Sequence, residues 1–376
     1  MKNQGFNNSE TQQKKIRVGI IGAGNIAKYA HLPSLKHLPD YEVTAIQSRG
    51  RHAAEEAANQ FGIKYIVDTV DELVNHPEVD LVAVITPGYK HDEGIRAAIS
   101  AKKDVYSEWP FTTSTKNAQE LVKLAKEAGI NTVIGLQRRT APVSRYMDDL
   151  IKEGYVGNVR SVRVHVSDDN FGSVRPEHLR WSIPAENFND VIVIFGAHFL
   201  DSIFNTFGWP QSFSSDLLSR YKEIEIKETG ELLPNTTPDE LVLSGRLRND
   251  AVISVHIEGG KRNGKGVQID ITGDKGDLKL TNKYVFGGIG QDYILQGAQG
   301  DDQPLRVLTV PESYIWLKSD EMGTGPLELG HEYAAYAKDL KEGTSYHTTF
   351  DDALKMHHFF DLLNESSEKG IRVNMK

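Results

Sequence analysis

The stretch IRVGIIGAGNIA, residues 16–27, decides the fold. Its β-branched run, Ile16 to Ile21, leads directly into the spacing G-x-G-x-x-A. Between a strand and a helix, this spacing lets a pyrophosphate approach backbone N–H groups at the helix N-terminus. Gly22 suits the tight turn, and Gly24 carries no side chain that would block the phosphates. We predict a dinucleotide site at Gly22, Gly24, Asn25 and Ile26; the alternative is a plain glycine-rich turn.

Strands and helices are predicted to alternate from this motif to about residue 140. The strands are short, nearly continuous apolar runs, which is typical of a parallel sheet covered by helices on both faces. The sequence therefore predicts a doubly wound Rossmann domain over residues 15–140, after a polar, disordered tail at residues 1–14. The predicted strands span 16–21, 43–47, 79–85, 104–106 and 132–134, and the predicted helices span 51–61, 71–75, 91–101 and 114–128.

The end of the second strand bears on which cofactor is bound. A strand that binds the ribose 2′-hydroxyl usually ends in Asp or Glu, but this one ends in Gln47-Ser48-Arg49. Ser48 can donate a hydrogen bond, and Arg49 can pair with a 2′-phosphate. The sequence favours NADP(H), with NAD(H) as the alternative. The alternative for Arg49 is a solvated loop cation.

The second half of the chain has a different periodicity. Val162, Val164 and Val166 alternate with polar residues, and the runs 241–247, 251–257 and 267–271 repeat this pattern. We predict an open, largely antiparallel sheet in an α/β domain over residues 141–376, closed by a helix from Phe350 to Glu368. The polar face of this sheet is either solvated or in contact with a second subunit.

Composition excludes several classes of function. The 376 residues include no cysteine, which excludes disulfides, thiolate catalysis and cysteine zinc sites. A net charge of -9 without a block of Lys and Arg argues against direct nucleic-acid binding, but leaves a regulatory protein partner open. The apolar stretch Val191 to Ala197 is too short to span a bilayer, and no signal peptide is recognisable, so we expect a cytoplasmic protein without a membrane segment. No metal site is predicted.

Two groups of residues in the second half could carry chemistry. On a helix, His198 and Asp201 share a face, so the carboxylate could orient the imidazole. His198 is then a candidate general base or hydroxyl-binding group, although such a pair could equally satisfy a helix near the core. Trp181 lies with Arg175, His178 and Arg180 in an irregular segment. That segment could border a sugar pocket or form an ordinary surface loop.

Taken together, these motifs resemble the Gfo/Idh/MocA family, named after glucose–fructose oxidoreductase, inositol dehydrogenase and a rhizopine-catabolism protein. The matching stretches cover essentially the whole chain after the tail. They are GIIGAGNIA at 19–27, TPGYKH at 86–91, DVYSEWP at 104–110, QRRTAP at 137–142 and GAHFLD at 196–201. The resemblance implies a Rossmann domain followed by an α/β domain whose open sheet commonly mediates oligomers, here a homodimer or homotetramer.

The chain departs from this family at two positions. Family dehydrogenases generally carry Glu-Lys-Pro where this chain has Glu108-Trp109-Pro110, and an Asp where it has Ile194. Neither Trp109 nor Ile194 can titrate, so the family's usual Lys/Asp relay cannot operate. Glu-Trp-Pro resembles the branch that contains the fungal galactose-switch repressor. That resemblance implies that Trp109 covers the nicotinamide face and that the Trp109–Pro110 bond is cis.

The motifs and the resemblance together give the predicted site. Cofactor contacts are predicted at Gly22, Gly24, Asn25, Ile26, Ser48, Arg49, Thr86, Pro87, His91, Glu108, Trp109 and Gln137, and substrate contacts at Trp109, Arg139, Trp181, His198 and Asp201. We expect an NAD(P)-binding oxidoreductase that acts on a sugar or polyol, with His198 as its remaining catalytic group. The alternative is a non-catalytic NADP- or sugar-sensing regulator.

Overall fold

The computed structural model describes residues 14–375, and its first half is a parallel sheet of six strands. The strand order is β3-β2-β1-β4-β5-β6, which is the doubly wound order with a switch point between β1 and β4. The predicted Rossmann sheet is therefore confirmed. The tail predicted for residues 1–14 lies, except for its last residue, outside the described residues. The strands are β1 (Ile16–Ile21), β2 (Tyr41–Gln47), β3 (Tyr65–Val67), β4 (Leu81–Val84), β5 (Asp104–Glu108) and β6 (Thr132–Gly135).

Two helices of this half, α3 (Val70–Val74) and α5 (Thr115–Ala128), begin at side chains that satisfy free backbone N–H groups. Thr69 and Glu72 form a capping box, and the Ser114 hydroxyl accepts from the Asn117 N–H. After the glycine motif the chain forms a π-helical segment, η1, before it continues as an α-helix. The sequence did not predict this local widening. The helical segments are η1 (Ala27–His31), α1 (Leu32–His37), α2 (Arg51–Phe61), α3 (Val70–Val74), η2 (Gly88–Lys90), α4 (His91–Ser100) and α5 (Thr115–Ala128).

The second half is built on a nine-stranded sheet in the order β17-β16-β15-β14-β7-β13-β12-β9-β18. Its neighbouring strands are antiparallel except for the parallel pair β7 and β13, so the predicted open, largely antiparallel sheet is confirmed. A small separate sheet joins β8, β10 and β11. The strands are β7 (Val159–Ser167), β8 (Val174–Arg175), β9 (Pro210–Leu218), β10 (Glu223–Ile226), β11 (Leu232–Pro234), β12 (Glu240–Leu247), β13 (Val252–Glu258), β14 (Gly266–Gly273), β15 (Gly276–Asn282), β16 (Ile294–Gln299), β17 (Arg306–Val307) and β18 (Val373–Asn374).

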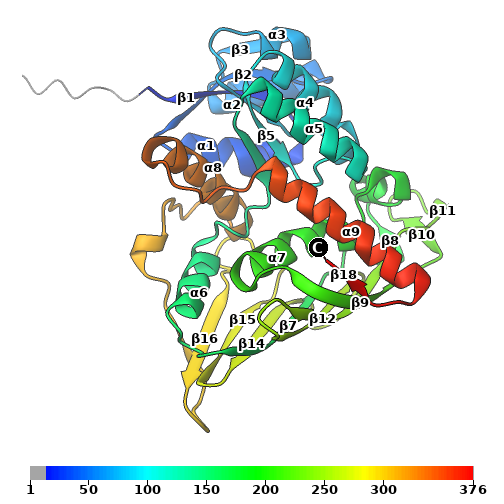
Figure 1. Cartoon of the computed structure of the whole chain (residues 1–376). Helices are drawn as coiled ribbons and strands as arrows, with labels where there is room; N and C mark the ends of the chain where they lie inside the picture. The colour runs from blue at the N-terminus through cyan, green and yellow to red at the C-terminus, as the bar shows by residue number, and fades with distance from the viewer. Residues whose placement is uncertain (1–13, 376) are drawn as a thin grey trace, which may run out of the picture.

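Helices cover one face of this sheet, as Figure 1 shows for α6 (Pro142–Lys152), α7 (Val191–Phe207) and α9 (Phe350–Lys369). The valines of β7 that alternate with polar residues are buried beneath them, as the period-two pattern predicted. The helical stretch Ala185–Phe207 is long and apolar enough to cross a membrane, which corrects the shorter estimate from the sequence. However, 83% of its apolar window is buried inside the protein, as expected for a core helix. The remaining short helices are η3 (Glu177–Ser182), η4 (Ala185–Asn187) and η5 (Glu312–Tyr314).

The chain returns to the first domain near its end. Helix α8 (Thr324–Glu342) packs against η1 and α1, and its Leu329, Tyr333 and Tyr336 complete the apolar core on that side of the parallel sheet. Figure 1 shows α8 beside α1, at the junction of the two halves. A division of the chain at residue 140 therefore places this helix in the second domain, whereas it packs on the first.

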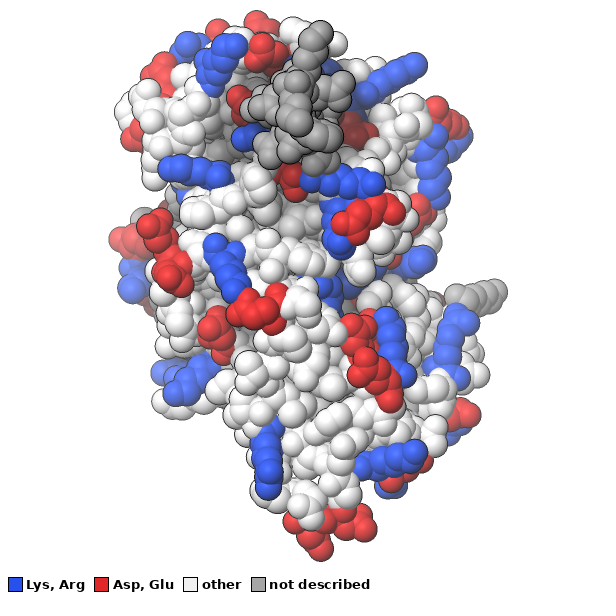
Figure 2. Space-filling model, turned by 90° about the vertical axis from the view of Figure 1, so that its left-hand side faces the viewer, with Lys and Arg blue, Asp and Glu red and all other residues white. Residues whose placement is uncertain are grey.

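The surface carries charges of both signs. Figure 2 shows Lys and Arg interspersed with Asp and Glu over one face of the molecule, without a broad area of one sign. Such a face provides no extended cationic track for a phosphate backbone. The expectation, drawn from composition, that the protein does not bind nucleic acid directly stays a prediction.

Candidate functional site

The two halves of the chain enclose a cleft with a volume of about 750 Å³. The glycine motif contributes Gly24, Asn25 and Ile26 to its wall, and the ends of β4 and β5 contribute the loops that follow them. Parallel strands present their carboxyl ends at one edge of the sheet, which is why these loops meet there. Of the predicted site residues, the cleft wall includes Gly24, Asn25, Ile26, Thr86, Pro87, His91, Glu108, Trp109, Gln137, Trp181 and His198.

The glycine motif has the geometry that a dinucleotide requires. Gly22 has φ +108°, and its N–H donates to the Gln47 carbonyl over 2.8 Å. A Cβ atom on Gly22 would lie 3.0 Å from the Ile85 carbonyl oxygen, whereas one on Gly24 would meet no atom within 4 Å. Gly22 therefore shapes the turn, and Gly24 leaves open space in front of the helix that starts at Asn25. The residues present fit a dinucleotide cofactor.

His91 joins the two loops on the cofactor side of the cleft. Its Nε2 lies 2.6 Å from the Thr86 carbonyl oxygen, and its Nδ1 lies 2.9 Å from that of Pro110. Burial lowers the pKa of His91, although these carbonyl contacts act in the opposite direction. The ring therefore holds the loop after β4 beside the loop after β5. The Trp109–Pro110 peptide bond within the second loop is cis, as the resemblance implied.

Trp109 lies in the wall of the cleft, at the position where the resemblance implies a lysine in dehydrogenases. Its indole N–H donates to the Val193 carbonyl over 3.0 Å, and the ring packs against His357 and Phe360. The side chain is only 5% exposed, and Ile194 lines the same cleft. An indole N–H is a donor that does not titrate in water. Trp109 thus supplies shape and one anchoring hydrogen bond to α7, but no acid or base.

Glu108 is held by the first domain and by α8 together. Its Oε1 accepts from the Tyr106 hydroxyl over 2.7 Å and lies 3.2 Å from His31 Nε2, while His31 Nδ1 lies 2.9 Å from the Tyr333 hydroxyl. Burial acts to raise the pKa of Glu108, but the contacts with His31 and Tyr106 outweigh it and lower that pKa. Glu108 is therefore an ionised carboxylate in the cleft wall at neutral pH.

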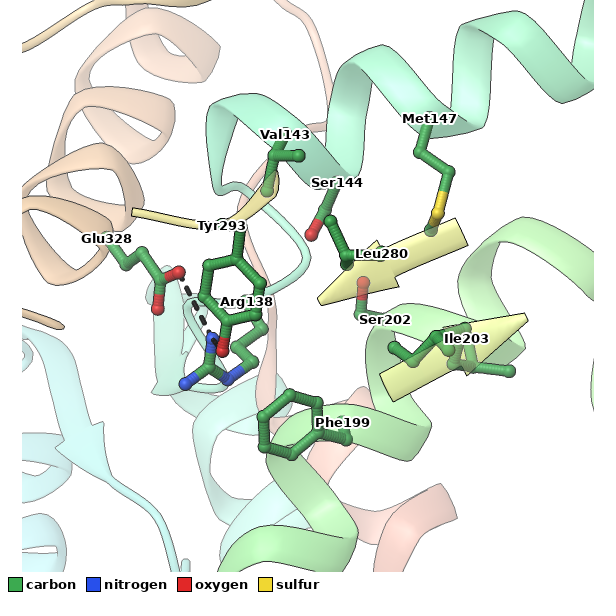
Figure 3. A pocket seen from close by; sticks show the side chains of 11 residues that line it. Arg138, Val143, Ser144, Met147, Phe199, Ser202, Ile203, Leu280, Tyr293 and Glu328 are labelled. Carbon is green, nitrogen blue, oxygen red and sulfur yellow. Dashed lines mark hydrogen bonds and ion pairs between the residues drawn. The ribbon is translucent and has the colours of Figure 1, made fainter. Parts of the chain in front are cut away.

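His198 faces the cleft from α7 and is 4% exposed. Among residues 14–375, its Nδ1 has no hydrogen-bond partner. Burial and the nearby Arg138 guanidinium lower the pKa of His198 to about 4, so its imidazole is neutral at pH 7. Figure 3 shows Arg138 between Phe199, Tyr293 and Glu328.

Arg138 belongs to the QRRTAP stretch, but no local pattern distinguished it from Arg139 as a site residue. It lies 3.1 Å from the Glu328 carboxylate and over the Phe199 ring, and is 4% exposed. Burial raises the pKa of Glu328 to about 7, against the effect of Arg138. Arg138 therefore acts on the site through its charge, which disfavours a proton on His198.

The structure corrects the prediction that Asp201 orients His198. Asp201 Oδ2 accepts from Arg139 Nε over 2.9 Å, its other oxygen accepts from Arg139 Nη2, and Asp201 is fully buried. Asp352, the second carboxylate on Arg139, lies 3.2 Å from Nη2. Residues three apart on a helix share a face, but the Asp201 carboxylate forms a bidentate ion pair with Arg139, which lies on another segment. Neither Arg139 nor Asp201 lines the cleft, so their predicted substrate contacts lack a geometric basis.

The segment around Trp181 is divided between the cleft and the core. Trp181 and His178 line the cleft, but Arg175 is 1% exposed and donates to the Ser182 hydroxyl and carbonyl. The cleft also contains polar residues that the sequence did not single out, because the fold brings them together from separate segments: Asp168, Asn170, Asn189, Lys265 and Tyr284. They follow β7, precede α7, or flank β14 and β15, and no local motif marks them.

The end of β2 has a simpler geometry than the sequence suggested. The Gln47 side chain is turned toward the Asp68 carbonyl, so it is occupied within the domain. Ser48 is half-buried and Arg49 is exposed, and neither lines the cleft. The Gly22 N–H donates to the Gln47 carbonyl, which fixes the end of β2 beside the glycine turn. Ser48 and Arg49 directly follow this fixed point. Their predicted contact with a ribose phosphate stays a prediction.

Comparison with known proteins assigns the chain to a family. A family model described as an oxidoreductase family with an NAD-binding Rossmann fold matches residues 16–135, and a model of the Gal80p C-terminal domain matches residues 142–282. The chain belongs to the Gfo/Idh/MocA oxidoreductase family. The second match confirms the resemblance to the branch with the galactose-switch repressor.

The similar proteins include both enzymes and regulators. The dehydrogenase aclE of Aspergillus oryzae is 26% identical over 95% of this chain and 97% of its own length. The galactose/lactose metabolism regulatory protein GAL80 of Saccharomyces cerevisiae is 25% identical over 77% of this chain and 72% of its own. The structure of levoglucosan dehydrogenase in complex with NADH and L-sorbose has a TM-score of 0.84 at 22% identity, over 96% of this chain and 99% of that one. The proteins similar to this chain thus include dehydrogenases and a regulatory protein of galactose/lactose metabolism.

Proposed function

We propose that this family member binds NADP(H) in the cleft and acts on a sugar or polyol by hydride transfer, with His198 as its remaining acid/base group. One observation carries the proposal. The open space at Gly24 and a set of polar and aromatic side chains that includes Trp181, Asp168 and Lys265 belong to the same cleft, and His198 lies in its wall. The volume of about 750 Å³ lies within the ~300–1,000 Å³ range of small-molecule sites. The dehydrogenase aclE, which is similar over almost its whole length, supports this proposal.

The chain's own residues divide the work of binding. When bound, the cofactor supplies the hydride chemistry, and the protein supplies position and charge. The backbone at Gly24, Asn25 and Ile26 would hold the pyrophosphate at the start of the helix. Trp109 would limit the space beside the reacting ring, and the carboxylate of Asp168 and the indole of Trp181 suit hydroxyl groups and a sugar face.

The proton of the reacting hydroxyl is assigned to His198, which is a weak base here. A pKa of about 4 is roughly 2.5 units below the ordinary value of histidine, which makes protonation harder by about 3 kcal/mol. A well-placed general base is worth ~10²–10⁴ in rate. With that base weakened and the usual lysine and aspartate replaced, we expect slow turnover.

The decisive experiment measures binding and turnover on the same preparation. NADPH and NADH binding is followed by fluorescence, and hydride transfer by absorbance across a panel of sugars and polyols. We expect binding by the parent protein and turnover that His198→Ala reduces without weakening the dinucleotide. Tight NADPH binding with no turnover on any substrate would reject the enzymatic proposal.

A specific observation favours a second function, namely a non-catalytic regulator that senses the dinucleotide or a sugar. Trp109 and Ile194 fill both positions of the usual relay, and the Trp109 indole is anchored to the Val193 carbonyl. The double variant Trp109→Lys with Ile194→Asp separates the two functions. A gain of turnover would mean that only the relay is missing, and unchanged inactivity with intact NADPH binding would favour the regulator.

The preference for NADP(H) is assigned to Arg49. In residues 14–375 its side chain forms no ion pair, whereas Arg51 pairs with Glu55 and Asp68. Arg49→Ala is therefore expected to weaken NADPH binding by at least ~10-fold and leave NADH binding nearly unchanged. Arg51→Ala is the matched control. An equal loss for both dinucleotides in Arg49→Ala would contradict the assignment.

The oligomeric state, location and partners of the protein are also proposed. The outer face of the nine-stranded sheet carries the exposed apolar side chains of Val242, Val252 and Ile294, which favours a homodimer or homotetramer through this face. Light scattering on the purified protein tests this, and a monomeric mass would reject it.

We further propose a cytoplasmic location. For the regulatory alternative we propose a protein partner, which co-purification with tagged protein would identify.

A further inference from the structure

Two histidines lie side by side on the outer face of the nine-stranded sheet, away from the cofactor cleft. His165 on β7 and His256 on β13 are direct partners in the parallel register of these strands. Their rings are nearly parallel, with centroids 5.3 Å apart and planes inclined by 24°. Because neighbouring residues along a strand point to opposite faces, Val164 and Val166 face the helices while His165 and His256 face outward.

Carboxylates surround both imidazoles. Glu258 follows His256 by two residues on the same face, and its Oε1 lies 2.8 Å from His165 Nε2. The donor atoms of these three residues all lie within 4.8 Å of one another. Glu240, on the neighbouring strand β12, has its Oε1 3.1 Å from His256 Nε2. Two imidazole nitrogens and two carboxylates thus converge on one patch of three adjacent strands.

We infer that His165, His256 and Glu258 form a binding site for a divalent transition-metal ion of the zinc type, with Glu240 in reach of the fourth position. Zn²⁺ binds histidine nitrogen at ~2.0–2.1 Å and carboxylate oxygen at ~2.0–2.2 Å in tetrahedral sites, which places its ligand atoms about 3.4 Å apart. The side chains are only half-buried and their donor atoms already lie within 4.8 Å of one another, so small side-chain rotations suffice to reach this spacing. Magnesium and calcium prefer sites made of oxygen alone, so the two imidazoles select a transition metal.

The charges of the site fit a dication. Two neutral imidazoles and two carboxylates present two negative charges to the ion. In the metal-free protein these are balanced by Lys261, whose Nζ lies 2.8 Å from Glu258 Oε1, and by Arg220, whose Nε lies 3.6 Å from Glu240 Oε2. Lys261 contacts the same oxygen that approaches His165, so it competes directly with a metal ion. Removal of Lys261 should therefore strengthen binding, which a plain surface ion-pair cluster would not predict.

The test is titration of the full-length protein, freed of metal by a chelator, with Zn²⁺ alone, followed by calorimetry. We expect saturable binding of one ion per chain. His165→Ala and His256→Ala should each weaken it by more than ~10-fold, since even changes outside the ligand set commonly weaken metal sites ~10–100-fold. Lys261→Ala should strengthen it by about 2–5-fold, in line with a surface ion pair. The control is His52→Ala, because His52 is exposed and its Nδ1 lies 3.5 Å from Glu56 Oε1, but it has no second histidine beside it.

Any outcome other than saturable binding that depends on the two histidines decides against the site. Affinity unchanged in both His165→Ala and His256→Ala would mean that Zn²⁺ binds elsewhere on the surface. A ratio of one ion per two chains, with a zinc-dependent increase in mass, would replace the site within one chain by a bridge between copies. Glu258→Gln keeps the size of the side chain and removes its charge. A loss of affinity in this variant, with an unchanged circular-dichroism spectrum, separates loss of a ligand from loss of fold.

Discussion

The assignment of Asp201 to a structural ion pair with Arg139, rather than to ligand binding, can be tested by replacing Asp201 with alanine. Asp201 is fully buried and neutralises Arg139, whose side chain is 16% exposed and which keeps Asp352 as its second partner. Burial acts against the charge of Arg139, but the two carboxylates outweigh it and raise its pKa. Removal of one partner from a buried pair costs about 3–5 kcal/mol, because an uncompensated charge stays behind. Since Asp352 remains, we expect the lower end, about 3 kcal/mol.

The assay is equilibrium unfolding in urea, with dinucleotide binding measured on the same samples. Asp201→Ala should lower the free energy of unfolding by about 3 kcal/mol while NADPH still binds the folded protein. The matched control is Glu55→Ala, which removes the exposed partner of Arg51 and should change stability by less than ~0.5 kcal/mol. If Asp201→Ala kept full stability but lost ligand binding, Asp201 would act on the ligand and the structural assignment would be wrong.

Two further predictions concern the cleft. Gly24→Val should weaken dinucleotide binding by at least ~10-fold at nearly unchanged stability, because the valine side chain enters the open space that the dinucleotide would occupy. Gly22→Ala should instead destabilise the fold, because Gly22 has φ +108° and its Cβ would approach the Ile85 carbonyl. Binding titrations and urea unfolding separate the two effects. His198, with a folded pKa of about 4, gives stability that is fully present above pH ~6.5 and declines as the pH falls toward 4, because the unfolded chain takes up the proton first. Between pH 6.5 and 5 the parent protein should therefore lose about 2 kcal/mol relative to His198→Gln in urea unfolding, and equal losses would contradict the lowered pKa.

Much of the fold follows from local patterns. The run at Ile16–Ile21 and the helices at Arg51–Phe61 and Phe350–Lys369 lie within about a residue of their predicted bounds, because periodicity and caps are encoded locally. The sequence did not reveal the α8 helix at Thr324–Glu342 or its place on the first domain. Such a placement depends on which apolar surfaces remain uncovered once the rest has folded, and no short window of sequence contains that information.

The candidate site likewise contains residues that local motifs predict and residues that only the fold brings together. Gly22 and Gly24 belong to a motif whose geometry is local, and they lie at the turn between β1 and the following helix, as the motif predicted. Thr86, which only the resemblance implied, lines the cleft, and its contact with a cofactor stays a prediction. The prediction that Asp201 orients His198 is wrong, because helical spacing predicts only which residues share a face. It cannot show that Arg139, from a distant segment, binds the Asp201 carboxylate at two points. Lys265 reaches the cleft through strand pairing alone, and the metal site likewise depends on the register of two strands.

The packing of α8 also has a consequence for synthesis of the protein. Core residues such as Val18 and Ile20 lie in the same apolar cluster as Tyr333 and Tyr336, about 315 residues later in the chain. At ~5–20 residues per second, the ribosome needs roughly 10–40 s to proceed from the end of the parallel sheet to that helix. During this time one flank of the nascent first domain stays uncovered and open to chaperones. A fragment that ends after β6 would carry the same exposed flank permanently, so a soluble dinucleotide-binding fragment requires α8 to be added back.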